Sequence, residues 1–189
     1  MKHKSLLIAA FALVAMAQLL VPTLMISYKA DYALKGKEFI FKIRHNRIGS
    51  SLRGNYLWLQ FEADKFKVED KSDWENSQRV FVTFGKDSVG YAKILNLTKE
   101  EPQNSQDWIK VRAFTSRLDS SSLRITYPFG NYYIPDGDKK EVQSLFNQVI
   151  SDSLKTISLK VHVKENQFLA GELMLDSVSF SDVLKGFRQ

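Results

Sequence analysis

The N-terminal part of the chain is an apolar run that differs from the alternating pattern of the rest. Residues 5–27 contain no ionisable side chain, and a helix of about 20 residues crosses the roughly 30 Å hydrocarbon core of a bilayer. Lys2 and Lys4 precede the run without an acidic neighbour. By the positive-inside tendency, we expect residues 1–4 in the cytoplasm, a transmembrane anchor over 5–27 and an extracytoplasmic domain over 28–189.

A cleaved signal peptide is the alternative interpretation of the same segment. Lys2 and Lys4 would then form its basic region, and Ala15-Met16-Ala17 would supply a cleavage site with small residues. Cleavage after Ala17 would leave the apolar stretch QLLVPTLMI at a new N-terminus, where its exposure to water is unfavourable. We therefore favour the uncleaved anchor; both interpretations place the domain outside the cytoplasm.

After the anchor, apolar and polar residues alternate in short segments between turn residues, which predicts antiparallel β-strands. The clearest alternation is in 156–164, where every second residue from Ile157 to Val163 is apolar. One face of such a strand is buried and the other is wet. We expect strands at 39–44, 55–62, 79–84, 91–97, 108–116, 123–127, 156–164 and 169–180, the last two paired as a hairpin through 165–167.

One segment has helical spacing instead. Between 138 and 151 the apolar residues recur at i, i+3, i+4, i+7 and i+8, which predicts an amphipathic helix that packs on the sheet rather than on a membrane or a partner. Asp138 is placed to cap it, with Glu141 three residues later. The predicted fold is mainly β: a single antiparallel barrel-like or sandwich-like domain with one amphipathic helix, preceded by one transmembrane helix. The apolar residues of the helix are Val142, Leu145, Phe146, Val149 and Ile150.

Charge and composition narrow the function classes. The chain has 27 Lys and Arg residues against 21 Asp and Glu residues, a net charge of +6, and it contains no cysteine. Without Lys2 and Lys4, the rest of the chain has 25 basic and 21 acidic residues, a mild net charge of +4, and these charges are interspersed. Nucleic-acid binding favours a concentrated basic stripe, so we expect no nucleic-acid partner. The lack of cysteine excludes a lipoprotein anchor, disulfides and thiol chemistry.

The segment Arg53-Gly54-Asn55-Tyr56-Leu57-Trp58-Leu59-Gln60-Phe61 resembles the signature of the GDYXXLXY family of bacterial membrane-anchored proteins. Asn55 stands where the signature has Asp, and Phe61 where it has Tyr. The similarity extends to VPTLMI (21–26), KGKEFIFK (35–42), RVFVTFGKDSVGYAKI (79–94), YPFGNYYIPDG (127–137) and LDSVSF (175–180). One departure is that 45–52 read HNRIGSSL, where members usually carry an Asp-Pro-rich turn.

The resemblance implies a protein of the bacterial inner membrane with its domain in the periplasm. It also implies association with a multi-pass membrane protein, but no known activity. We therefore expect a membrane-anchored accessory or interaction domain. An envelope ligand-binding module is the alternative, and a signal-peptidase-like hydrolase is a weaker one, with Ser50, Ser51 and Lys86 as its candidate residues.

The signature itself predicts a turn that leads into a strand. Gly54 is expected to have a positive φ or to allow a close backbone approach, and the neighbouring Arg53 to bond exposed carbonyls. Alternation places Leu57, Leu59 and Phe61 in the core and the other side chains on the opposite face. Two interpretations stay open for the remaining aromatics, packing or a binding surface. These aromatics are Tyr56, Trp58, Phe129, Tyr132 and Tyr133.

Candidate residues for catalysis are few. The histidines, His3, His45 and His162, lack metal-ligand spacing, and His45 is expected in a basic loop. Asp136-Gly137-Asp138 reads as a turn that begins a helix, because the rest of a calcium loop is missing. We therefore expect no enzymatic activity, no metal and no cofactor, with the bilayer as one partner of residues 5–27.

Overall fold

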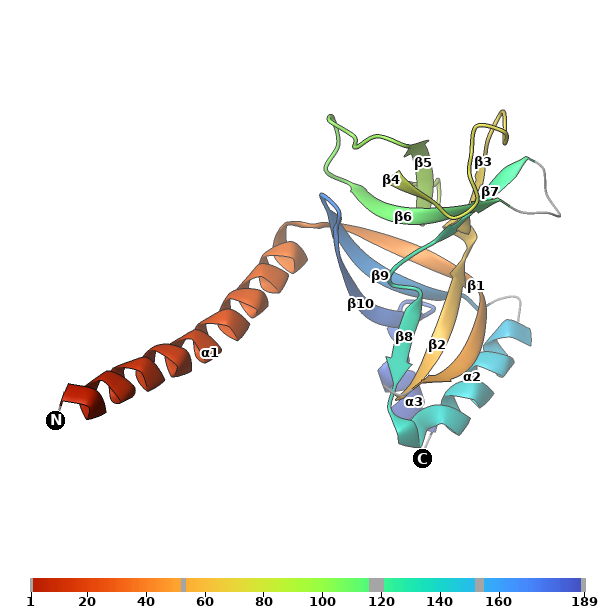
Figure 1. The fold of residues 1–189 in the computed structure, drawn as a ribbon. Helices are drawn as coiled ribbons and strands as arrows, with labels where there is room; N and C mark the ends of the chain where they lie inside the picture. Colours follow the sequence, from red (N-terminus) through yellow and green to blue (C-terminus); the bar gives the residue numbers. More distant parts are fainter. Residues whose placement is uncertain (1, 52–53, 116–120, 152–154, 188–189) are drawn as a thin grey trace.

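A long N-terminal helix is followed by a β domain in the computed structural model, which describes residues 2–51, 54–115, 121–151 and 155–187 (Figure 1). Helix α1 covers Lys2–Lys35, and strand β1 (Lys37–Ser51) begins directly after it. Within α1, the window Ala10–Ser27 has a mean hydropathy of 2.0 over 18 residues. This is long and apolar enough to cross a membrane, although a signal sequence has the same character.

The described strands form two antiparallel sheets, which confirms the mainly β prediction. The six-stranded sheet has the order β11-β10-β9-β1-β2-β8, and the five-stranded sheet has the order β3-β7-β6-β4-β5. One isolated bridge, between Ile40 and Tyr91, joins them. The other strand bounds are Gly54–Phe61 (β2), Lys65–Lys67 (β3), Gln78–Lys86 (β4), Ala92–Thr98 (β5), Trp108–Thr115 (β6), Ser122–Thr126 (β7), Asn131–Ile134 (β8), Ile157–Lys164 (β9), Gln167–Leu175 (β10) and Val178–Ser179 (β11).

A cluster of aromatic rings joins the two sheets. The ring of Phe41, on β1, lies 5.2 Å from that of Phe84 on β4, 5.5 Å from Tyr127 and 5.0 Å from Phe129, measured between centroids. Phe61 contributes a further edge contact at 5.5 Å from Phe41. Because all five side chains are buried, the sheets share one hydrophobic core, and edge-on rings add to the energy of burial.

The chain crosses from one sheet to the other at two described points, and hydrogen bonds fix both crossings. The 3-10 turn η1 (Glu62–Asp64) leads from β2 to β3, and residues 127–130 lead from β7 to β8. The Tyr127 hydroxyl donates to the carbonyl of Ala63 in the first crossing. The amide of Leu59 donates to the carbonyl of Gly130 at 2.7 Å, which ties the second crossing to β2.

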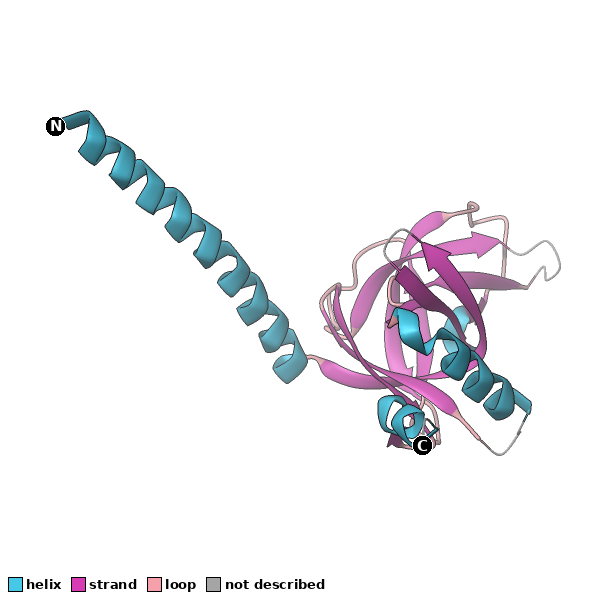
Figure 2. Ribbon diagram, turned by 90° about the horizontal axis from the view of Figure 1, so that it is seen from below, coloured by secondary structure: helices cyan, strands magenta, loops and turns pink. Residues whose placement is uncertain are grey.

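Two helices cover the end of the curved six-stranded sheet that faces away from the five-stranded sheet (Figures 1 and 2). Helix α2 (Lys139–Ser151) follows the turn η2 (Asp136–Asp138) and buries Val142, Leu145, Phe146 and Val149 as predicted. The side chain of Ile150 is outside the described set. Helix α3 (Phe180–Phe187) packs beside α2, with the rings of Phe146 and Phe180 5.1 Å apart.

The structure corrects the predicted strand 169–180. Strand β10 ends at Leu175 because Asp176 and Ser177 both have positive φ, 47° and 75°, which turns the chain. After the short β11, Phe180 and Leu184 recur at helical spacing and are buried. The prediction of one amphipathic helix in the domain was therefore incomplete, because a pattern of this length suits a strand or a helix.

The expected loop at His45 is also wrong. Strand β1 continues past the bulge between Ile43 and His45, and His45 pairs with Gln60 of β2. The bulge shifts the register and the following residues resume pairing, so the polar sequence after Arg44 stays extended. Strands β3 and β8 were not predicted either, because each is short and forms at the edge of a sheet.

Candidate functional site

Gly54 has the backbone conformation that the signature predicts. It is the first residue of β2, and its φ of +110° lies where residues with a Cβ are rarely found. Asn55 pairs with Ser50 of β1 and with Ile134 of β8. Arg53 lies outside the described residues, so its predicted role stays a prediction.

The apolar positions of the signature serve the core. Leu57, Leu59 and Phe61 are 0%, 3% and 1% exposed, as predicted. Tyr56 faces the other side, where it lies opposite Gly49 of β1. A Cβ on Gly49 would come within 2.4 Å of the Tyr56 ring, so that ring covers the backbone of the glycine. The positions that define the signature therefore have structural roles in this chain.

The remaining aromatic candidates divide between core and surface. Phe129 is buried and Tyr132 is half-buried, where burial and the charge of Glu172 raise the pKa of Tyr132. Trp58 and Tyr133 are 40% and 51% exposed. The Arg47 guanidinium lies 5.8 Å from the Trp58 ring. The packing interpretation holds for the first pair, and the second pair faces solvent.

The structure does not bring the candidate catalytic residues together. Ser50 pairs with Asn55 at one end of β1, whereas Lys86 pairs with Ala92 in the other sheet, beside the Tyr91 bridge to Ile40. His162 Nε2 lies 3.9 Å from a carboxylate oxygen of Glu38 across β9 and β1. Within the described ranges, no group of three or more His, Asp or Glu side chains is placed to hold a metal ion.

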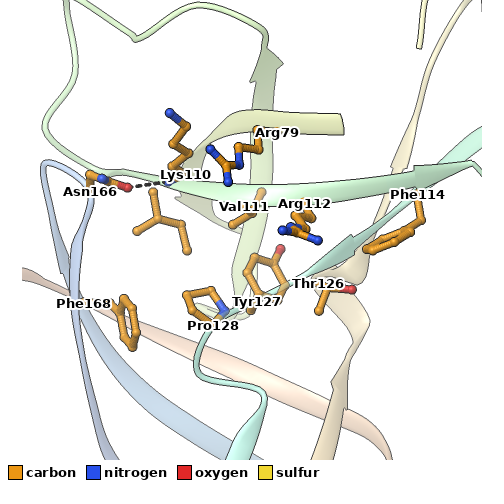
Figure 3. A pocket seen from close by; sticks show the side chains of 11 residues that line it. Arg79, Lys110, Val111, Arg112, Phe114, Thr126, Tyr127, Pro128, Asn166 and Phe168 are labelled. Carbon is orange, nitrogen blue, oxygen red and sulfur yellow. Dashed lines mark hydrogen bonds between the residues drawn. The ribbon is translucent and has the colours of Figure 1, made fainter. Parts of the chain in front are cut away.

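A groove of about 680 Å³ opens where β7 leaves the five-stranded sheet (Figure 3). Strand β7 pairs with β6 only from Arg112 onward. Before that residue, the β9–β10 turn takes the place of β7: the Lys110 amide donates to Asn166 Oδ1 at 2.8 Å, and the Asn166 amide donates to the Trp108 carbonyl at 2.9 Å. The groove lies between these two neighbours of β6.

The lower part of the groove is apolar and its upper part is basic. Ile109, Val111, Tyr127, Pro128 and Phe168 supply apolar surface. The cationic side chains line β6 and the adjacent β4, as Figure 3 shows. A site with an apolar floor and a few polar groups is the usual form of a ligand pocket, whose volume is about 300 to 1,000 Å³. The cations are Arg79, Lys110 and Arg112.

These three cations lack acidic partners among the described residues. No carboxylate is among the residues that line the groove, and none of the three forms an ion pair with the part of the chain that the structure describes. Arg79 and Arg112 lie directly opposite each other on β4 and β6, and like charges in such pairs are destabilising. A bound anion would offset that repulsion.

Sequence reasoning did not find this groove. Lys110 and Arg112 alternate with Ile109 and Val111 along β6, and this pattern predicts a strand. The alternation also places both cations on one face, which was the available signal. Arg79, on a separate strand, joins them only through the pairing of β4 with β6.

The family model described as GDYXXLXY protein matches residues 18–170. The matched region contains the C-terminal half of the apolar window, the signature strand and every residue that lines the groove. No curated protein and no solved structure matches the chain.

Proposed function

This chain belongs to the GDYXXLXY family, and we propose that it is a membrane-tethered, non-catalytic domain that binds an anionic ligand in the groove of the five-stranded sheet. The observation that carries the proposal is an apolar floor beside three cations without a carboxylate. The apolar part of a ligand would contact Pro128 and Phe168, and its anionic group would lie near Arg79 and Arg112. Binding would relieve the repulsion between the two guanidinium groups.

The structural role of the signature supports this choice of site. Gly54, Tyr56, Leu59 and Phe61 are used for backbone conformation and packing, so the signature offers little surface for a ligand. The groove, in contrast, is lined by exposed cations whose charges the described chain leaves unneutralised. Arg suits this role because its guanidinium presents several donors to carboxylate or phosphate oxygens.

The proposed location is the bacterial inner membrane, with the N-terminus in the cytoplasm and the domain in the periplasm. The apolar window of α1 and the charges of Lys2 and Lys4 support it. The family match begins at residue 18 and so includes the C-terminal half of the apolar window.

A multi-pass membrane partner is the second candidate function, and Gln18 and Pro22 in α1 favour it. Pro22 has no N–H to donate to the carbonyl of Gln18, and the Gln18 side chain is exposed on the helix. Polar groups without partners are costly in hydrocarbon, and amide side chains bond across neighbouring helices. A Gln18→Leu chain should lose co-purifying membrane proteins that a Thr23→Val chain keeps, since Thr23 bonds its own backbone at Leu19.

Binding of small probes to the full-length chain tests the groove. The chain is placed in nanodiscs of neutral phosphatidylcholine, and saturation-transfer NMR compares 2-naphthyl phosphate with neutral 2-naphthol. We expect the phosphate to bind more tightly, and Arg79→Gln or Arg112→Gln to weaken it by about three- to fivefold each, as for an exposed ion pair. Lys140→Gln, on the exposed face of α2, is the matched control. Equal binding of both probes, or unchanged binding by the arginine variants, contradicts the proposal.

A further inference from the structure

Four cations cross the outer face of the five-stranded sheet in a diagonal row that extends beyond the groove. Lys65 of β3 lies opposite Arg124 of β7. Arg124 lies opposite Phe114 of β6, which makes Arg112, two residues earlier, its diagonal neighbour. Arg112 lies opposite Arg79 of β4. We call Lys65, Arg124, Arg112 and Arg79 the basic row.

The row is continuous at the scale of side-chain contacts. Adjacent strands lie about 4.8 Å apart, so four strands extend over roughly 15 Å. Directly opposite and diagonal residues have Cβ atoms about 5 to 8 Å apart. A ligand with a single negative charge reaches one or two members of the row. A linear ligand with several charges reaches all four, and it offsets two like-charge pairs, Lys65 with Arg124 and Arg79 with Arg112.

The outward positions near the row on β4, β6 and β7 carry no carboxylate. The outward positions between and beside the four cations on β4, β6 and β7 are Phe81, Thr83, Lys110, Phe114 and Thr126. Lys110 adds a fifth positive charge, its Nζ lying 5.2 Å from the Phe81 ring. The face is therefore basic across β3, β7, β6 and β4, with apolar patches between the charges.

Asp64 is the acidic residue whose charge reaches the row, and it lies in the interior. Its side chain is 6% exposed, and Arg44 Nη2 lies 3.3 Å from its Oδ2. Its carboxylate also attracts Arg124 and Lys65. Asp64 is buried, however, so its carboxylate does not lie on the outward face of the row.

The aromatic side chains on this face are too buried to serve as a platform for nucleobases. Base stacking needs free aromatic faces, but Phe81 and Phe114 are half-buried and Trp108 is buried. Half-buried rings still offer apolar contacts to the C–H groups of a sugar. The proposed periplasmic location also places the row among envelope polymers. We propose that the basic row binds a linear acidic glycan, a polymer that carries a carboxylate or phosphate on successive sugars; this inference rests on the proposed function of the groove.

Oligogalacturonates of two and eight units, labelled for fluorescence anisotropy, test the row on the full-length chain in neutral nanodiscs. The octamer should bind at least about tenfold more tightly than the dimer, because it engages more cations, and its affinity should fall as salt rises. Lys65→Gln, outside the groove, should weaken the octamer about three- to fivefold and leave the dimer unchanged. Arg112→Gln should weaken both, and Lys140→Gln neither.

The outcomes separate this inference from the proposed function. If Lys65→Gln binds the octamer as the unmodified chain does, or if octamer and dimer bind equally, the row is overturned while the groove stands. If 2-naphthyl phosphate also fails to bind, the groove itself is overturned. An eight-residue oligothymidylate that binds more tightly than the octagalacturonate at equal salt overturns the glycan assignment. Lys65 is exposed, so its substitution should leave the fold intact. Thermal unfolding of each variant checks that the fold is retained.

Discussion

At Gly54, a single residue determines how the chain enters β2. Its φ of +110° is costly for any side chain with a Cβ, whereas the next residue is already in a regular strand. This explains why the signature begins with glycine and why the positions after it alternate between core and surface. Asp64 is a second residue with an effect of its own, because its carboxyl group is buried inside the domain and its charge state depends on its surroundings.

We expect Gly54→Ala to lower the free energy of unfolding by about 1 to 2 kcal/mol, because alanine is strained at this φ. Urea unfolding of the full-length chain in nonionic detergent, followed by tryptophan fluorescence, measures the change. Gly137→Ala is the control: a Cβ there meets no atom within 4 Å, and its φ is not in the left-handed region. Equal midpoints for the two variants would disprove the account of the signature.

Asp64 should make the domain less stable as the pH rises. Burial raises the pKa of Asp64 above its ordinary 3.8, while Arg44, Arg124 and Lys65 act to lower it. The folded state therefore keeps the proton at a pH where the unfolded state has lost it. The stabilising contribution is present below 3.8 and is lost as the pH rises through the raised pKa.

Unfolding free energies at a series of pH values check this sign. The difference between the unmodified chain and Asp64→Asn should fall as the pH rises above 3.8, since only the unmodified chain has this group. A difference that rises with pH instead would mean that the arginines dominate and that the pKa is lowered.

At the scale of elements, helix α2 follows its pattern closely. The predicted stripe packs inward, and α3 contributes the partner ring of Phe180. The exposed residues of α2 interact along the helix instead, as Gln143 does with Asn147 at 2.8 Å. The helix pair thus closes one end of the curved sheet (Figure 2).

Phe146→Ala should destabilise the domain by about 3 to 5 kcal/mol, the usual cost of removing a fully buried aromatic side chain. Asn147→Ala, next to it on the exposed face, should change stability by less than about 0.5 kcal/mol. The midpoints of urea unfolding for the two variants show whether Phe146 belongs to the core. A loss below about 1 kcal/mol for Phe146→Ala would indicate that the stripe is not part of the core.

At the scale of the whole molecule, the chain consists of an apolar helix and a β domain. Figure 1 places the five-stranded sheet on the opposite side of the domain from α2 and α3. The proposed basic row therefore belongs to a part of the molecule that neither helix covers.

Protease added to spheroplasts should digest the domain beyond Lys35 while the first residues stay protected, because Lys2 and Lys4 favour the cytoplasmic side. The intact mass should still include residues 2–17. Protection of the domain would overturn the proposed orientation, and a mature N-terminus at Gln18 would establish a signal peptide. A cytoplasmic protein of known location serves as the control for leakage.

Properties that depend on neighbours in the sequence were predictable. The alternation in β9, the stripe of α2 and the positive φ of Gly54 each follow from a local pattern, since strand and helix periods and the tolerance of glycine act within a few residues. The signature also identified the family before any coordinates. Local patterns did not predict the strands that depend on a neighbouring strand. The extension of β1 past Arg44 requires pairing with β2, and β3 and β8 each require a sheet edge to pair with.

The apolar helix, the β class, the core faces and the family could be read from the sequence, because each is encoded in contiguous residues. The groove and the basic row, in contrast, depend on how the strands pair. Lys65, Arg79, Arg112 and Arg124 are interspersed with other residues along the chain, which argued against a basic stripe, yet the strand order β3-β7-β6-β4 brings them together. Net charge is a sum over the chain, whereas a binding surface depends on which strands are neighbours.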